Sequence, residues 1–347
     1  MRRWEVVSGY ETLRHGLFGR KGAGSALANV DTLVLDIDGV VVDISDSFRH
    51  AVSLAIQFYF GRVRGWPGGA TLIQPEETQW FKSAGGFNSD VDLLRAVMIF
   101  YLWKSSLLSK PHLDHMRALD PSLFEYAREL KEMGGGVPAA HKFLHLRAPE
   151  AVAREVLERS EEEIPEIIEI FSEYYAGSEC RAVYGFEPTH VSGTEGLFRR
   201  ERRLLDPTLL DGLPLKLGIV TGRMSGEAGL ALGLAGLEDR FDPGNIVVHD
   251  GPFRKPDPGA LIYLCGRLGS RSGLFVGDTV DDFQMVQNYE RLRMSCTAPG
   301  GLPLVLFAGV LTGVHGEDAL GLFSERGADL IALDVNCLLQ SLRKTPF

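Results

Sequence analysis

The chain has 347 residues, of which 45% are hydrophobic and 24% are charged, and it carries a formal net charge of -10. These values are typical of a globular protein that is long enough for two domains. The acidic balance argues against a broad nucleic-acid-binding surface, because binding to a phosphate backbone needs an excess of Lys and Arg on one face. A few well-placed cations would still hold a small phosphorylated ligand.

Export and membrane signals are weak. The opening Met1-Arg2-Arg3-Trp4 is not followed by a continuous apolar segment, and the longest apolar stretch falls short of the roughly 20 residues of a spanning helix. The four cysteines are widely spaced without a C-x-x-C pair, which favours free thiols in a reducing compartment. We therefore expect a cytoplasmic protein with neither a membrane nor a nucleic acid as partner.

Short apolar runs without polar alternation predict β-strands, and such runs are typical of strands covered by helices on both faces. The predicted strands are 32–35, 217–220, 245–248, 273–276, 304–310 and 330–333. Gly- and Ala-rich segments between them predict crossover helices at 226–236, 258–268 and 281–291. Alternating elements of this kind predict an α/β fold with a doubly wound parallel sheet.

The region 44–211 has few strand signals and predicts α-helices. An apolar helix is expected at 47–60, and Ser160-Glu161-Glu162-Glu163 predicts a capping box that opens a helix through Tyr175. The glycines at 134–136 predict a surface loop through Pro138, and the arginines at 199–203, interleaved with Glu195 and Glu201, predict a solvated helix face. We predict a discontinuous α/β core and an inserted helical domain, with boundaries at 1–43 plus 212–347 and at 44–211.

Polar motifs lie beside the predicted strands of the core. They are Asp36-Ile37-Asp38-Gly39, Thr221-Gly222-Arg223, Lys255-Pro256-Asp257-Pro258 and Gly277-Asp278-Thr279-Val280-Asp281-Asp282. One such motif alone is typical of a turn, but the ordered set beside successive strands is far more specific. Because open α/β sheets bind ligands at the carboxyl ends of their strands, we expect the motifs to converge there.

Two acids at the end of the first core strand can divide the work of a substitution reaction. Asp36 can attack phosphorus as a nucleophile, while Asp38 protonates the leaving oxygen. A carboxylate that faces a dianionic phosphate needs its charge offset, which a hard divalent cation with oxygen ligands does well. Asp278, at another strand end, is the natural third ligand.

The second and third motifs supply groups that are suited to binding phosphate oxygens. Thr221 supplies a hydroxyl and Gly222 an unhindered backbone N–H at the end of a second strand. Lys255 adds a positive charge on a loop that its neighbouring prolines stiffen. Together these groups would neutralise the charge that builds up on a phosphoryl group in transfer.

The motifs, in this order, resemble those of the haloacid dehalogenase superfamily in its arrangement with a large helical cap inserted after the first strand. The resemblance implies a Rossmann-like core and covers roughly 31–43 and 215–342. It also implies that Asp36 forms an aspartyl-phosphate and that Asp38 acts as acid and then as base. Mg2+ would be held by Asp36, the backbone carbonyl of Asp38 and Asp278, with Asp282 supporting that site.

This resemblance implies a Mg2+-dependent phosphatase for a small phosphorylated metabolite. Asp38 disfavours carbon–halogen cleavage, because a halide leaves without a proton whereas an alkoxide needs one. A phosphomutase, which returns the phosphoryl group to a sugar, remains an alternative. So do a phosphonate hydrolase with Lys82 as its Schiff-base lysine and a binding module with a spent site, although the intact motifs count against the last.

The helical domain is expected to select the substrate. Segment 82–90 is polar and glycine-rich, and together with 43–49 it resembles the cap of a phosphatase-like subgroup. The candidate substrate-binding residues are Gly222, Arg223, Arg49, Lys82, Gly86 and Asn88. Structural alternatives stay open, since the glycines at 85 and 86 are also typical of a helix end and Arg49 of a solvated helix.

Overall fold

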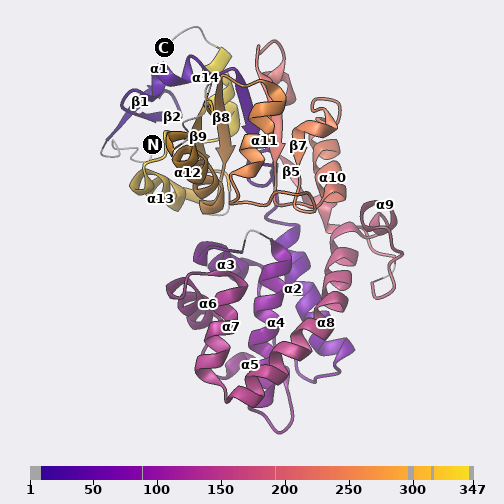
Figure 1. The fold of residues 1–347 in the computed structure, drawn as a ribbon. Helices are drawn as coiled ribbons and strands as arrows, with labels where there is room; N and C mark the ends of the chain where they lie inside the picture. The colour runs from indigo at the N-terminus through magenta and orange to yellow at the C-terminus, as the bar shows by residue number, and fades with distance from the viewer. Residues whose placement is uncertain (1–8, 88, 192, 296–300, 314–315, 344–347) are drawn as a thin grey trace. The chain divides into compact units, whose positions relative to one another are not determined.

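The computed structural model describes residues 9–87, 89–191, 193–295, 301–313 and 316–343, and they form two compact units (Figure 1). Residues 1–43 and 201–347 make an α/β unit, and residues 44–200 make a helical unit. The segment 201–211, expected in the helical domain, belongs to the α/β unit. There β5 (Arg202–Arg203) pairs with β4 (Val42–Asp43), and the short 3-10 helix Pro207–Leu210 packs on α14 (Val335–Arg343).

The α/β unit is built on a sheet that has eight strands among the described residues, in the order β1-β2-β10-β9-β8-β3-β6-β7. The strands are β1 Tyr10–Arg14, β2 Leu17–Arg20, β3 Thr32–Leu35, β6 Lys216–Val220, β7 Ile246–Val247, β8 Ser272–Gly277, β9 Leu304–Val310 and β10 Leu330–Ala332. From β3 the chain adds β6 and β7 on one side and then β8, β9 and β10 on the other, so the strand order reverses at β3.

The predicted parallel sheet is confirmed, because β3 and the strands from β6 to β10 pair in parallel. The N-terminal hairpin of β1 and β2 was not predicted, and it extends the sheet by pairing antiparallel to β10. Ligands of open α/β sheets bind where the strand order reverses, which places the expected site at the carboxyl end of β3.

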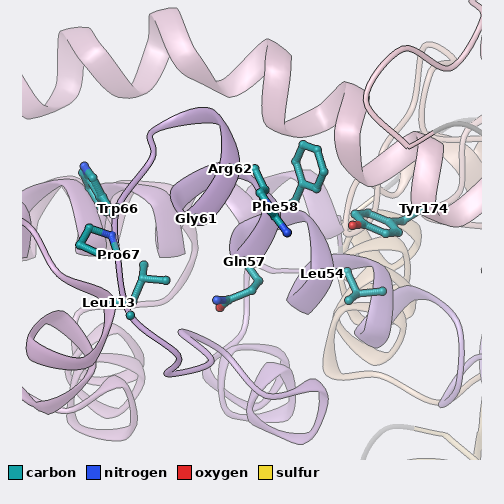
Figure 2. Close-up of a pocket in the computed structure, with 10 residues that line it drawn as sticks. Leu54, Gln57, Phe58, Gly61, Arg62, Trp66, Pro67, Leu113 and Tyr174 are labelled. Atoms are coloured by element: carbon teal, nitrogen blue, oxygen red, sulfur yellow. The ribbon is translucent and has the colours of Figure 1, made fainter.

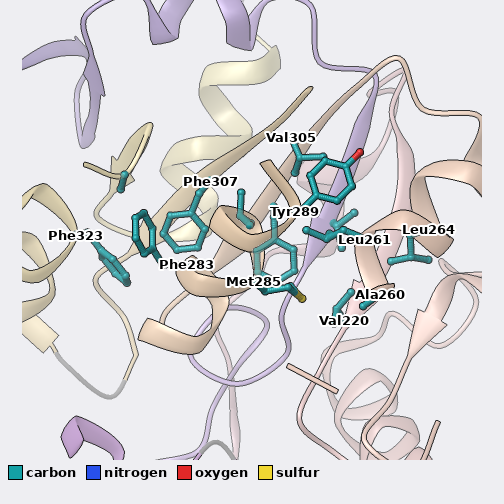
Figure 3. Close-up of a cluster of buried hydrophobic side chains, with 14 of the residues drawn as sticks. Val220, Ala260, Leu261, Leu264, Phe283, Met285, Tyr289, Val305, Phe307 and Phe323 are labelled. Carbon is teal, nitrogen blue, oxygen red and sulfur yellow. The ribbon is translucent and has the colours of Figure 1, made fainter. Parts of the chain in front are cut away.

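Helices connect the parallel strands and cover their apolar side chains. They are α10 Ser225–Ala235, α11 Gly259–Leu268, α12 Val280–Ser295 and α13 Ala319–Arg326, with the short α1 Ala23–Leu27 after β2. Figure 3 shows the buried cluster in which Leu261 of α11 and Met285 of α12 lie with Phe307 of β9. Phe307 stacks on Phe275 and meets the ring edge of Phe283 at a centroid distance of 5.4 Å. This packing fixes the first turn of α12 beside the sheet.

The helical unit is arranged around α4 (Asp90–Ser106), which is buried along most of its length and contacts α2, α7 and α8. Its other helices are α2 Phe48–Phe58, α3 Thr78–Ala84, α5 Leu113–Ala118, α6 Leu123–Glu132, α7 Gly136–Arg147, α8 Glu150–Ala176 and α9 Cys180–Tyr184. Helix α2 continues as the π-helix Tyr59–Val63, and 3-10 turns lie at Pro75–Glu77 and Leu197–Arg200. Among the described residues, no helix is both long and apolar enough to cross a bilayer.

The predicted start of a helix at Ser160 is wrong, because α8 begins at Glu150. Ser160 lies inside this helix, and its hydroxyl donates to the carbonyl oxygen of Leu157 (2.8 Å). The break occurs earlier because Ala148 precedes Pro149, and a proline disfavours helical backbone in the residue before it. Similarly, α7 begins at Gly136 and includes Pro138 in its first turn, so the predicted loop 134–138 is shorter than expected.

The aromatic cluster gives the first testable prediction. Phe307 is fully buried, so Phe307→Ala should lower the free energy of unfolding by about 3–5 kcal/mol through lost burial and a residual cavity. Denaturant unfolding of the full chain measures this change. Leu234→Ala on α10 is the control, because Leu234 is 42% exposed and its truncation should cost less than about 1 kcal/mol. Equal effects would contradict the assignment of Phe307 to the core.

Candidate active site

The predicted motifs meet at the carboxyl end of β3. Leu35, the last residue of β3, pairs with Ile219 of β6 on one side and with Val276 of β8 on the other. Asp36, Thr221 and Asp278 follow directly after these three strands, and all three are at most 3% exposed. The parallel register therefore gathers side chains that are as distant along the chain as Asp36 and Asp278.

A cluster of carboxylates lies at the centre of the site. Asp36, Asp278 and Asp282 each offer an oxygen atom, and these atoms lie within 4.8 Å of one another. Lys255 contacts two of the three, since its Nζ lies 2.7 Å from Asp36 Oδ1 and 2.7 Å from Asp282 Oδ1. With all four groups ionised, the cluster keeps a net charge of -2 from three carboxylates and one ammonium. A buried all-oxygen donor set with this charge fits a hard divalent cation.

The charges of the cluster strongly perturb its members. Burial raises the pKa of Asp36 well above its ordinary value, the charge of Lys255 opposes this shift, and the neighbouring carboxylates add to it. For Lys255, burial opposes the charged form, but the carboxylates of Asp282 and Asp36 outweigh it and raise the pKa. The lysine is therefore held as a cation, while for Asp36 the effect of burial outweighs the opposing charge of Lys255 and keeps the pKa above its ordinary value.

Asp282 is oriented by the first turn of α12. Its Oδ2 accepts hydrogen bonds from the backbone N–H groups of Asp278 (3.2 Å) and Thr279 (3.0 Å) and from the Thr279 hydroxyl (2.7 Å). Its Oδ1 faces Lys255. Both oxygens are thus engaged within the protein, which suits a supporting role for Asp282 beside a metal held by other groups.

Two glycines allow the backbone to approach Asp278 closely. Gly39 has a φ of +69°, and a Cβ there would lie 2.5 Å from Asp278 Oδ2. At Gly313, in the loop after β9, a Cβ would lie only 1.7 Å from the same oxygen. The Thr312 hydroxyl joins the two loops by donating to the carbonyl oxygen of Gly39 (2.5 Å). Gly313 was not predicted as a site residue. Its position shortly after the predicted strand 304–310 was the feature of the sequence that could have indicated it.

Thr221 is held at the end of β6 by hydrogen bonds on two sides. Its backbone N–H donates to the carbonyl oxygen of Val247, and its hydroxyl oxygen accepts from the backbone N–H of Arg223 (3.2 Å). Gly222 lies between them, at the same strand end. The proposed contacts of Thr221 and Gly222 with phosphate oxygens stay predictions.

Arg223 contacts carboxylates rather than facing solvent. Its side chain is 1% exposed, with Nε 2.7 Å from Asp38 Oδ1 and Nη2 3.0 Å from Glu201 Oε2. Glu201 was predicted to lie on a solvated helix, which is wrong, because its side chain is fully buried beside this guanidinium. Asp38 remains 27% exposed, so it is reachable from outside. The direct contact with substrate predicted for Arg223 stays a prediction, and in the structure its guanidinium pairs with two carboxylates of the protein.

The candidate residues of the helical unit have partners within that unit. Arg49 donates to Gln79 Oε1 (3.0 Å), and Lys82 Nζ lies 3.0 Å from Asp90 Oδ1. Gly85 ends α3 with a φ of +83°, so the helix-terminator interpretation holds there, and Gly86 packs against the backbone of Gly136. Asn88 lies outside the described residues. A role of these residues in substrate binding stays a prediction.

The helical unit also contains a pocket of about 460 Å³. Figure 2 shows its aromatic and aliphatic walls, with Trp66, Pro67 and Leu113 at one end and Leu54 and Tyr174 at the other. The described candidates Arg49, Lys82 and Gly86 are not among its lining residues. The pocket is therefore a feature distinct from the candidate substrate-binding residues.

Comparisons with known proteins match the whole fold rather than a sequence family. No protein-family model and no curated protein matches the chain. The solved structure of phosphatase Tt82 from Thermococcus thioreducens aligns over 90% of this chain and 99% of its own, with 23% identity and a TM-score of 0.55. Northeast Structural Genomics Consortium target ZR25 aligns over 90% of this chain and 98% of its own, with 18% identity and a TM-score of 0.54. At these identities the likeness shows a shared fold.

The close approach at Gly313 gives a prediction. In Gly313→Ala the added methyl group would overlap Asp278 Oδ2, so we expect a loss of about 1–3 kcal/mol in the free energy of unfolding. Gly321→Ala is a matched control in the same unit, because nothing lies within 4 Å of a Cβ there, and α13 should gain slightly from alanine. Thermal and denaturant unfolding compare the two variants, and similar stabilities would refute the close packing.

Proposed function

We propose that this chain, which has the fold of the haloacid dehalogenase superfamily, is a Mg2+-dependent phosphatase that hydrolyses a small phosphorylated metabolite. The observation that carries the proposal is the buried cluster of Asp36, Asp278, Asp282 and Lys255 at the point where the strand order reverses. The similar structure from Thermococcus thioreducens is named a phosphatase, which agrees with this proposal.

The first step uses Asp36 as the nucleophile. One of its carboxylate oxygens forms a bond to phosphorus while the bond from phosphorus to the ester oxygen breaks. The proton carried by Asp38 moves to the departing oxygen, so the product leaves as an alcohol. The product of this step is an aspartyl-phosphate on Asp36.

The second step reverses the role of Asp38. A water molecule attacks the phosphorus of the aspartyl-phosphate, Asp38 takes its proton, and the bond from Asp36 to phosphorus breaks to release inorganic phosphate. Asp38 suits both steps because it is 27% exposed, whereas the side chain of Asp36 is only 5% exposed. The more buried acid thus attacks, and the more accessible acid exchanges protons.

Charge neutralisation falls to Lys255, Thr221 and the cation site. Lys255 places its ammonium 2.7 Å from the nucleophile, next to where phosphoryl oxygens would lie. Asp36, Asp278 and the backbone carbonyl of Asp38 would hold Mg2+, and Asp282 would support them. When bound, the cation offsets the negative charge of the carboxylates and the phosphate, so that the two can approach.

The proposal predicts that Asp36→Asn abolishes turnover, because an amide is a poor nucleophile. In Mg2+-containing buffer the wild-type chain should release phosphate from members of a panel of phosphate esters. Asp36→Asn should lower kcat by at least about 1000-fold, as loss of a nucleophile does in other enzymes. Asp239→Asn, which changes an exposed carboxylate of the same unit, should keep full activity.

Two results would count against this mechanism. Turnover that persists in Asp36→Asn would remove the proposed nucleophile. Formation of a phosphorylated sugar rather than inorganic phosphate, dependent on a bisphosphate activator, would favour the phosphomutase alternative.

The cation site predicts a pH dependence of metal binding. Because the pKa of Asp36 is raised, folding of the metal-free chain favours its protonated form, and this contribution to stability is lost as the pH rises through that pKa. Mg2+ needs the ionised carboxylates, so protons compete with it at low pH. We expect Mg2+ to raise Tm more at pH 7.5 than at pH 5, with a stabilisation of about 2.7 kcal/mol when its concentration is 100 times Kd.

Differential scanning calorimetry with Mg2+ or with a chelator measures this effect. Asp278→Asn should lose the Mg2+-dependent increase in Tm, and Asp239→Asn should keep it. An increase in Tm that is as large at pH 5 as at pH 7.5, or that survives in Asp278→Asn, would refute the assigned cation site.

A further inference from the structure

Two positively charged side chains in the site each bridge a pair of carboxylates, and only one of these pairs belongs to the proposed Mg2+ site. Lys255 lies between Asp36 and Asp282, whereas Arg223 lies between Asp38 and Glu201. We propose that Arg223 and Glu201 are positioning residues. They hold the Asp38 carboxylate so that its Oδ2 is the oxygen that gives and receives the proton. The inference rests on the proposed function, since it concerns the acid of that reaction.

The contact with Arg223 distinguishes the two oxygens of Asp38. Arg223 Nε donates to Asp38 Oδ1 at 2.7 Å, a short charge-assisted hydrogen bond with a planar donor of fixed direction. Such a bond restricts rotation of the carboxylate and leaves Oδ2 as the oxygen that gives and receives the proton. Because the guanidinium is 1% exposed and Asp38 is 27% exposed, Arg223 holds the acid from the protein side.

Arg223 is itself fixed through its backbone and its side chain. Its N–H donates to the Thr221 hydroxyl oxygen (3.2 Å), and its carbonyl oxygen accepts from the N–H of His249 (2.8 Å). Nη1 donates to the carbonyl oxygen of Glu227 in the first turn of α10 (3.3 Å). Because both its backbone and its guanidinium are fixed, Arg223 can hold the Asp38 carboxylate in one orientation.

Glu201 explains how a buried guanidinium stays in place during turnover. The charge of Asp38 changes when it gives or takes a proton, which would leave Arg223 without a charged partner if it had no other. Buried charges are tolerated only when paired. Glu201 Oε2 lies 3.0 Å from Nη2, and its side chain is fully buried, so this pair persists whichever form Asp38 takes.

The chain connects Glu201 to Asp38 by a second route. Glu201 is the first residue of the α/β unit after the helical insertion, and the next residues, Arg202 and Arg203, pair with Asp43 and Val42. The backbone N–H groups of 204 and 205 both donate to the carbonyl oxygen of Val41, three residues after Asp38. The segment that carries the acid and the segment that carries its counter-ion are thus bonded to each other.

A comparison of leaving groups tests this role. Hydrolysis of an alkyl phosphate needs a proton on the leaving oxygen, whereas p-nitrophenyl phosphate has a leaving group that departs with little help. We expect Glu201→Gln and Arg223→Lys to lower kcat on the alkyl phosphate at least about ten-fold more than on p-nitrophenyl phosphate, a fraction of the total effect of a general acid. A general disturbance of the fold would lower both rates by the same factor.

Glu290→Gln is the matched control. Glu290 is a largely buried carboxylate of the same unit that pairs with Arg293 (2.7 Å), and it lies eight residues along α12 from Asp282. It should show no leaving-group selectivity. Circular dichroism and Tm verify that each variant folds. Should Glu201→Gln fail to fold, Arg223→Lys, which keeps a cation between the two carboxylates, decides the question.

The outcomes separate this inference from the proposed function. Selective loss on the alkyl phosphate, with Asp36→Asn inactive on both esters, supports both. Equal loss on the two esters, or no loss, with Asp36→Asn inactive, overturns the positioning role alone. Activity that persists in Asp36→Asn overturns the proposed function and this inference with it.

Discussion

The double ion pair of Lys255 with Asp36 and Asp282 is the interaction on which the site depends. Carboxylates this close and this deeply buried would repel one another and resist ionisation without a cation among them. Removing such charges from water costs several kcal/mol per ion, so the cluster is not expected to stabilise the fold. The proposed chemistry at the carboxyl end of β3 accounts for this cluster better than a contribution to stability does.

Each acid at the end of β3 has its own cation, and this gives the two acids different properties. Asp36 lies in the interior beside Lys255, in a cluster whose three carboxylates outnumber its one ammonium group. Asp38 lies nearer solvent, and Arg223 fixes it from the protein side while Glu201 offsets the charge of the guanidinium. Two residues apart in the chain, the acids thereby suit nucleophilic attack and proton transfer respectively.

Elements with a local signal were predicted well, and elements without one were not. Apolar runs identified β3 and β9 to the residue, because strands covered on both faces are apolar throughout. The start of α8 was misplaced since a Ser-x-x-Glu pattern also occurs inside helices, where the serine bonds to its own helix. The hairpin of β1 and β2 lacked a long apolar run, and its place at the sheet edge follows from pairing with β10, some 310 residues away.

The sequence by itself determined the type of sheet and the residues of the four motifs, because strand patterns and motif spacing are properties of neighbouring residues. Only the tertiary structure decided which groups each motif contacts: Arg223 with Glu201, Gly313 with Asp278, and residues 201–211 with the α/β unit. These contacts join segments that are distant in the chain, and their partners are selected by burial and charge compensation in three dimensions. A glutamate among arginines has the same local pattern on a solvated helix as beside a buried guanidinium, so no local rule distinguishes the two.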